Sequence, residues 1–293
     1  MTSTPRTARC GPARRVVWQG RRLTVAPYAV LWFCFLLAER MSWAALETEP
    51  LDVDAGVAAQ RARSIGAALQ RVAVPILRLR NGRAEPLASG ALYVFGSSLL
   101  LLTCRHVFDD GANAGDLGLP LGESGRILWL GEARPRVLVD PGADLAAVRI
   151  GSRRSAGLLR RHWRAAPFFS LASETRAQIY VLAGFPYAQM RRVGAVLHAR
   201  PVVVLARGSM EGDHLKVSYR RVARRADGTE IHAPALDGVS GATLWAVLEA
   251  DTDTRTVDCV LQPAAVQSSF KHDAYVRAEP VGGFFRLLQS RLS

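Results

Sequence analysis

The sequence from residue 73 onward is a succession of short apolar runs separated by turn residues, and this pattern constrains the fold most strongly. The runs are rich in valine, leucine, isoleucine and aromatic residues, which is typical of β-strands. They cover residues 74–79, 90–95, 99–103, 126–130, 136–139, 145–150, 178–184, 192–197, 202–205, 215–219, 242–248, 257–261 and 275–278. Turn pairs such as Asn81-Gly82 and Asp227-Gly228 lie between several of them. Many short strands in succession predict a mainly β domain over residues 73–293, built as a sandwich or as barrels.

One helix is expected on each side of the strands. Residues 51–72 form a predicted helical lead-in, since apolar residues recur there at helical spacing: Val53, Val57, Ile65, Leu69 and Val72. Near the other end, residues 281–292 predict a short closing helix. Its apolar side chains lie near one face: Phe284, Phe285, Leu287 and Leu288.

Residues 1–50 form an extension of a different character. Residues 1–22 hold six arginines and no acid, and an apolar stretch follows at residues 25–38. That stretch is shorter than the roughly 20 residues needed to cross a bilayer, and the combination describes a secretory signal or a membrane attachment. Such a segment would place the protein in the periplasm, outside the cell or on a membrane. If Met41 is the true start, the protein is cytoplasmic.

The excess of positive charge is carried almost entirely by arginine. The formal net charge is +13, yet Lys216 and Lys271 are the only lysines. The arginines are spread along the chain, as codon usage in a GC-rich bacterial genome would produce, and no basic run is interleaved with aromatic residues. We therefore expect a solvated basic surface and no nucleic-acid partner.

The four cysteines predict neither a metal site nor a disulfide framework. Cys10, Cys34, Cys104 and Cys259 contain no pair at the spacing of a structural metal site. Cys104 and Cys259 lie in apolar, strand-like runs, where buried free thiols are more typical than a disulfide. The sequence does not decide against a disulfide between these two residues. We expect no metal and no other cofactor.

Three short segments contain residues that could carry chemistry. His106 follows a predicted strand that ends at Thr103, and Asp144 directly precedes the apolar run 145–150. Ser240 lies between Gly238 and Gly241, just before another predicted strand. Taken alone, each segment would fit equally well as an ordinary loop, strand end or glycine-rich turn.

Taken together, the three segments resemble the signature segments of trypsin-like serine proteases, in the same chain order. Thr103–Val107 is similar to the Thr-x-x-His-Val motif, Asp144–Val148 to Asp-Leu-Ala-x-Leu, and Gly238–Gly241 to Gly-x-Ser-Gly. Residues 89–94 and 181–186 resemble two further strands of the family, the second of them in bacterial HtrA-like members. The resemblance covers about residues 73–290.

This resemblance implies a chymotrypsin-like fold of two six-stranded antiparallel β-barrels. It also implies a serine endopeptidase that hydrolyses protein or peptide substrates through an acyl-enzyme, with His106, Asp144 and Ser240 as the triad. A serine hydroxyl is a poor nucleophile until an imidazole takes its proton, and the carboxylate orients and stabilises that imidazole. The backbone N–H groups of Gly238 and Ser240 would form the oxyanion hole.

The sequence departs from the family in places that bear on activity. Ala242-Thr243 replaces the usual Gly-Pro, and Val239 replaces the aspartate used in zymogen activation. By resemblance, Ala235, Leu236 and Gln262 line the primary substrate pocket, which would suit a small or medium apolar side chain. No PDZ-like domain is expected after the barrels. The alternatives are an inactive, protease-like binding module and an unrelated β-sandwich whose motifs arose by chance.

Overall fold

A computed structural model describes most of the β region. The described residues are 45–47, 65–66, 69, 71–109, 113–122, 125–168, 177–193, 196–225, 228–249 and 259–292, all of them in one compact unit, Phe33–Ser293. The apolar stretch 25–38 and most of the predicted helix 51–72 lie outside these residues, although Ile65, Gly66 and Leu69 are helical. Within the described part of the chain, no helix is long and apolar enough to cross a membrane.

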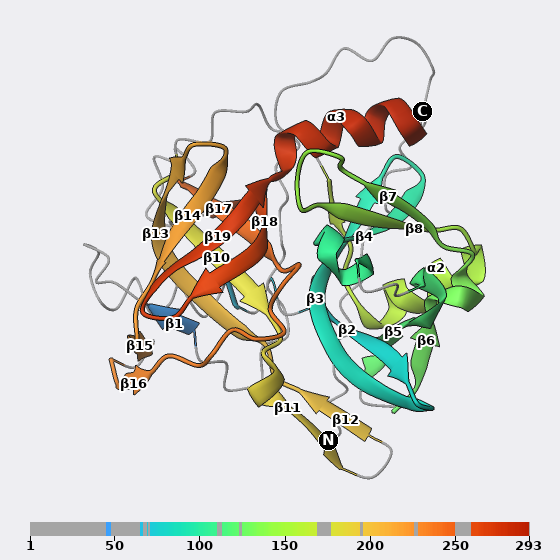
Figure 1. The fold of residues 1–293 in the computed structure, drawn as a ribbon, viewed down its shortest axis with the longest axis horizontal. Coiled ribbons are helices and arrows are strands. Elements are labelled where there is room, and N and C mark those ends of the chain that lie inside the picture. Colours follow the sequence, from blue (N-terminus) through green and yellow to red (C-terminus); the bar gives the residue numbers. More distant parts are fainter. Residues whose placement is uncertain are drawn as a thin grey trace, which may run out of the picture. The chain divides into compact units, whose positions relative to one another are not determined.

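The N-terminal half of the β region forms one curved sheet (Figure 1). Its strands are β2 (Ala73–Arg80), β3 (Arg83–Phe95), β4 (Ser98–Thr103), β5 (Leu117–Pro120), β6 (Ile127–Trp129), β7 (Arg136–Val139), β8 (Ala146–Ile150) and β9 (Ala166–Pro167). The order is β6-β5-β2-β3-β4-β8-β7, and β9 pairs with β3. Neighbours along this path are antiparallel, whereas β9 is parallel to β3.

This first sheet corrects the prediction of two closed barrels, because it stays open between β6 and β7. These two strands are short and are joined by the 3-10 helix η4 (Leu130–Ala133), after which Arg134 takes a left-handed conformation. The turn separates the strands instead of pairing them. Residues of this sheet still enclose their own apolar core, which includes Ile76, Leu101 and Val148.

The C-terminal half confirms the other barrel. Six strands close on themselves through the pairing of β10 with β13: β10 (Ile179–Gly184), β17 (Thr243–Glu249), β18 (Cys259–Lys271), β19 (Ala274–Pro280), β14 (His214–Tyr219) and β13 (Val202–Glu211). Short strands extend this sheet past β13: β1 (Ala45–Glu47), β15 (Val222–Arg225) and β16 (Glu230–His232). A separate hairpin is made by β11 (Met190–Val193) and β12 (Val196–Ala199).

Two helices complete the described structure. The predicted closing helix is confirmed as α3 (Val281–Leu292), whose Phe284 and Leu288 are fully buried. They belong to an apolar cluster that also contains Tyr93 of the first sheet and Trp245 of the second barrel, whose rings stack at 5.8 Å. The two β units are therefore fixed to each other by a shared core. Helix α2 (Arg153–His162), next to the first sheet, was not predicted.

Candidate active site

His106 and Asp144 form a hydrogen-bonded pair at one end of the first sheet. Strand β4 ends at Thr103, and His106 follows in the 3-10 helix η1 (Arg105–Phe108). Thr103 pairs with Ala146 of β8, so the end of β4 and the start of β8 lie side by side. His106 Nδ1 lies 2.7 Å from Asp144 Oδ2, and the His106 backbone N–H donates to Oδ1 at 2.9 Å. The Asp144 carboxylate therefore contacts His106 at two points, the ring and the backbone N–H.

Both members of this pair have shifted pKa values. The hydrogen bond to Asp144, helped by the contact with Cys104, raises the pKa of His106 to about 10 against the opposing effect of burial. Burial alone would raise the pKa of Asp144, but the two hydrogen bonds from His106 outweigh it, and the pKa is lowered. The geometry thus stabilises an imidazolium next to a carboxylate.

Ser240 lies in a tight turn of the second barrel that packs directly on the first sheet. Ser89 of β3 holds this turn: its N–H donates to Ser240 O at 2.8 Å, and its hydroxyl donates to Gly238 O at 2.9 Å. The Ser89 hydroxyl also accepts from the Phe185 N–H. A single side chain of the first sheet thereby fixes the serine turn and the segment after β10.

Glycine is required on both sides of Ser240. Gly238 has φ +89°, and a Cβ there would lie 2.3 Å from the Tyr187 ring. Gly241 has φ +87°, and a Cβ there would lie 2.1 Å from Thr103 Oγ1 and 2.3 Å from Ser89 O. The serine turn therefore touches the residue that ends β4, three positions before His106.

We expect Gly241→Ala to destabilise the protein through this contact. Gly228 offers a matched control, since its φ is +85° and a Cβ there would meet nothing within 4 Å. Both variants carry the conformational cost of a side chain at positive φ, but only Gly241→Ala adds a collision with backbone and with Thr103. The difference in unfolding free energy should be about 1–3 kcal/mol, measured by urea denaturation. Equal destabilisation of the two variants would contradict the close packing of the turn.

Two backbone donors of the serine turn have no partner among the residues that the structure describes. The N–H groups of Gly238 and Ser240 donate to no residue of the described chain, whereas the Val239 N–H between them donates to Leu236 O at 2.9 Å. An unpaired N–H on the serine itself and a second one two residues before it can together stabilise an oxyanion. These are the two donors that the sequence analysis names for the oxyanion hole, and that role stays a prediction.

The structure brings His106 and Asp144 together, but it does not join His106 to Ser240 by a hydrogen bond. His106 Nε2 instead lies 3.3 Å from the Sγ of Cys104, which is fully buried and free, as expected for this cysteine. The sequence analysis missed this neighbour. A cysteine two residues before a histidine carries no signal of its own, because the contact arises from the bend between β4 and η1.

The three residues predicted to line a substrate pocket lie in different environments. Leu236 is fully buried in the interior of the second barrel, and Gln262 is buried on β18 opposite Ala246 of β17. Ala235 is the exposed member of the three. The side chain of Leu236 therefore does not line a surface pocket, and the substrate pocket stays a prediction.

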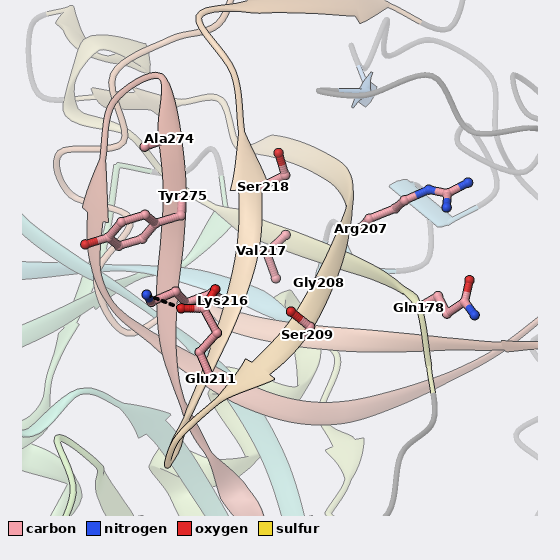
Figure 2. Close-up of a pocket in the computed structure, with 10 residues that line it drawn as sticks. All are labelled: Gln178, Arg207, Gly208, Ser209, Glu211, Lys216, Val217, Ser218, Ala274 and Tyr275. Atoms are coloured by element: carbon pink, nitrogen blue, oxygen red, sulfur yellow. Dashed lines mark hydrogen bonds and ion pairs between the residues drawn. The ribbon is translucent and has the colours of Figure 1, made fainter.

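A hollow on the second barrel is lined by none of these residues (Figure 2). It has a volume of about 510 Å³ and is lined from β13, β14 and β19. Lys216 pairs there with Glu211 and lies over the Tyr275 ring at 4.9 Å from its centre. Since this lysine is already engaged, we assign the hollow no role.

No family model and no curated protein matches this chain. Solved structures are similar to it, and three of them follow. A thermostable serine protease, AL20, from an extremophilic microorganism is 12% identical, with TM-score 0.47, over 77% of this chain and 99% of that chain. A structure named HBP is 14% identical, with TM-score 0.47, over 76% and 91%. A human pathogenic astrovirus serine protease is 15% identical, with TM-score 0.38, over 71% and 88%.

Proposed function

We propose that this protein is a serine endopeptidase that hydrolyses protein or peptide substrates. Ser240 attacks the carbonyl carbon of the scissile bond while His106 Nε2 takes its proton. The acyl-enzyme forms as His106 returns this proton to the leaving amine, and water then releases the acyl group by the reverse sequence. Asp144 holds the proton on Nδ1, so that Nε2 presents its lone pair to the serine.

The observation that carries the proposal is the double contact between Asp144 and His106. A carboxylate that accepts from both the ring and the backbone N–H of one histidine fixes its orientation and its tautomer together. The serine turn packs against the strand that precedes this histidine, and two of its N–H groups have no partner among the described residues. These contacts support a site in which the first sheet supplies the base and its orienting acid and the second barrel supplies the nucleophile and the oxyanion donors.

Cys104 is not the nucleophile of this site, although it contacts the same imidazole. Its side chain is fully buried, so its sulfur cannot reach a substrate carbonyl. Ser240 is partly exposed.

A fluorophosphonate probe tests the proposed nucleophile directly. We expect one covalent adduct per chain, located on Ser240 by peptide mass spectrometry, and no adduct in Ser240→Ala. Absence of labelling in a folded protein would favour the second candidate, a protease-like binding module. The contact of Nε2 with Cys104 in place of Ser240 is the observation that favours this alternative.

The raised pKa of His106 gives the pH dependence of the reaction. A general base acts when neutral, so kcat/KM should rise with pH and have its midpoint above 6.5, the ordinary value for histidine. Cys104→Ala removes one of the two contacts that raise this pKa, and the midpoint should fall. A pH–rate profile from pH 5 to 10.5 measures both. A midpoint at or below 6.5 in the unaltered protein would show that the Asp144 contact does not govern its base.

A further inference from the structure

Cys104 Sγ and His106 Nε2 are two potential metal ligands that lie close together. Sγ and Nε2 lie 3.3 Å apart, and the ligand atoms of Cys104, His106 and Asp144 all lie within 4.8 Å of one another. In a tetrahedral zinc site, bond lengths of about 2.3 Å to sulfur and 2.0–2.1 Å to nitrogen place the two ligand atoms about 3.5 Å apart. The observed separation of 3.3 Å is close to this value.

Asp144 completes the pattern from the other side of the ring. Its two oxygens are both engaged by His106, at the ring Nδ1 and at the backbone N–H. A carboxylate on the far nitrogen is the partner that zinc-bound histidines commonly have, because it fixes the tautomer and directs the other nitrogen at the ion. Asp144 is therefore placed to hold the imidazole so that Nε2 is directed at a bound ion.

We propose that Cys104 Sγ and His106 Nε2 bind a zinc-type divalent ion, with Asp144 as the orienting partner and water in the remaining positions. On binding, the proton of the Cys104 thiol and any proton on Nε2 leave to solvent, and the ion bonds to the thiolate and to the nitrogen lone pair. The histidine is 42% exposed, so the site opens toward solvent on the imidazole side.

The consequence for regulation rests on the proposed function. An ion on Nε2 occupies the lone pair that must accept the Ser240 proton, so the bound enzyme cannot start the reaction. Zinc should therefore inhibit hydrolysis reversibly, and a chelator should restore it. Magnesium and calcium prefer oxygen ligands and should not compete.

Cobalt binding tests the site without any measurement of activity. Co²⁺ added to the Ser240→Ala protein should give a thiolate-to-cobalt charge-transfer band at one ion per chain, and Zn²⁺ should abolish the band by displacement. The band should disappear in Cys104→Ala and in His106→Gln, and Asp144→Asn should weaken binding by about 10- to 100-fold. If Cys104→Ala does not fold, Cys104→Ser decides in its place.

The Cys104 variants retain Cys10, Cys34 and Cys259. A band that persists in them would come from those thiols and would overturn the proposal, as would the absence of a band in the Ser240→Ala protein. A cobalt band in Ser240→Ala together with no peptide hydrolysis by the unaltered protein would refute the protease and leave the metal site standing. If the unaltered protein hydrolyses peptides but Ser240→Ala gives no cobalt band, the metal site is refuted and the protease stands.

Discussion

Ser240→Ala is expected to abolish peptide hydrolysis and leave the fold intact. Loss of the nucleophile in an enzyme of this mechanism lowers kcat by a factor on the order of 10⁶. The stability cost should be small, within about 0.5 kcal/mol, because the Ser240 hydroxyl makes no hydrogen bond to the described residues. Cleavage of a casein-type substrate and a thermal melting curve measure the two effects.

Ser290→Ala provides the control for this experiment. Ser290 lies on α3, where its exposed hydroxyl donates to Leu287 O, so its removal also deletes a serine oxygen but leaves the candidate site untouched. Full activity is expected in this variant. Undiminished cleavage by Ser240→Ala would show that another residue attacks the substrate, and unfolding of Ser240→Ala would show that the turn depends on the hydroxyl.

The strands that the sequence predicted best are those buried along most of their length. Residues 145–150 and 178–184 correspond closely to β8 and β10, because both strands are mostly apolar and end at turns. Strand β13 was predicted only as residues 202–205, since its continuation to Glu211 is largely exposed and polar. Strand β18 was cut short for another reason: Pro263 lies inside it, and proline argues against a strand interior.

Helix α2 could not be predicted from its apolar pattern. Ser155 and Leu159 are its buried residues, so few large apolar side chains mark its inner face. What starts the helix is local: the Ser152 hydroxyl accepts from the Ser155 N–H. A capping serine surrounded by arginines is too common in loops to predict a helix by itself.

The part of the candidate site that lies within short sequence motifs could be predicted. The Thr-x-x-His and Asp-Leu-Ala segments sit at the ends of neighbouring strands, so the sequence placed His106 beside Asp144 correctly. The contacts between the two β units could not be predicted from the sequence. The dual role of Ser89 and the approach of Cys104 to Nε2 depend on how the second barrel docks and how η1 bends, which no local pattern encodes.

Asp144→Asn should lower turnover by a factor on the order of 10⁴, because an amide that donates to the ring would hold His106 in the wrong tautomer. Asp140, four residues earlier, is the competing acid, and Asp140→Asn is the matched control. Its Oδ1 accepts from the N–H groups of Gly142 and Ala143, at 2.8 and 3.2 Å, and so closes a turn. An asparagine oxygen can accept the same bonds, so turnover should change little. Steady-state kinetics of both variants at one pH decide the matter: greater damage from Asp140→Asn would mean that the acid partner of His106 has been misassigned.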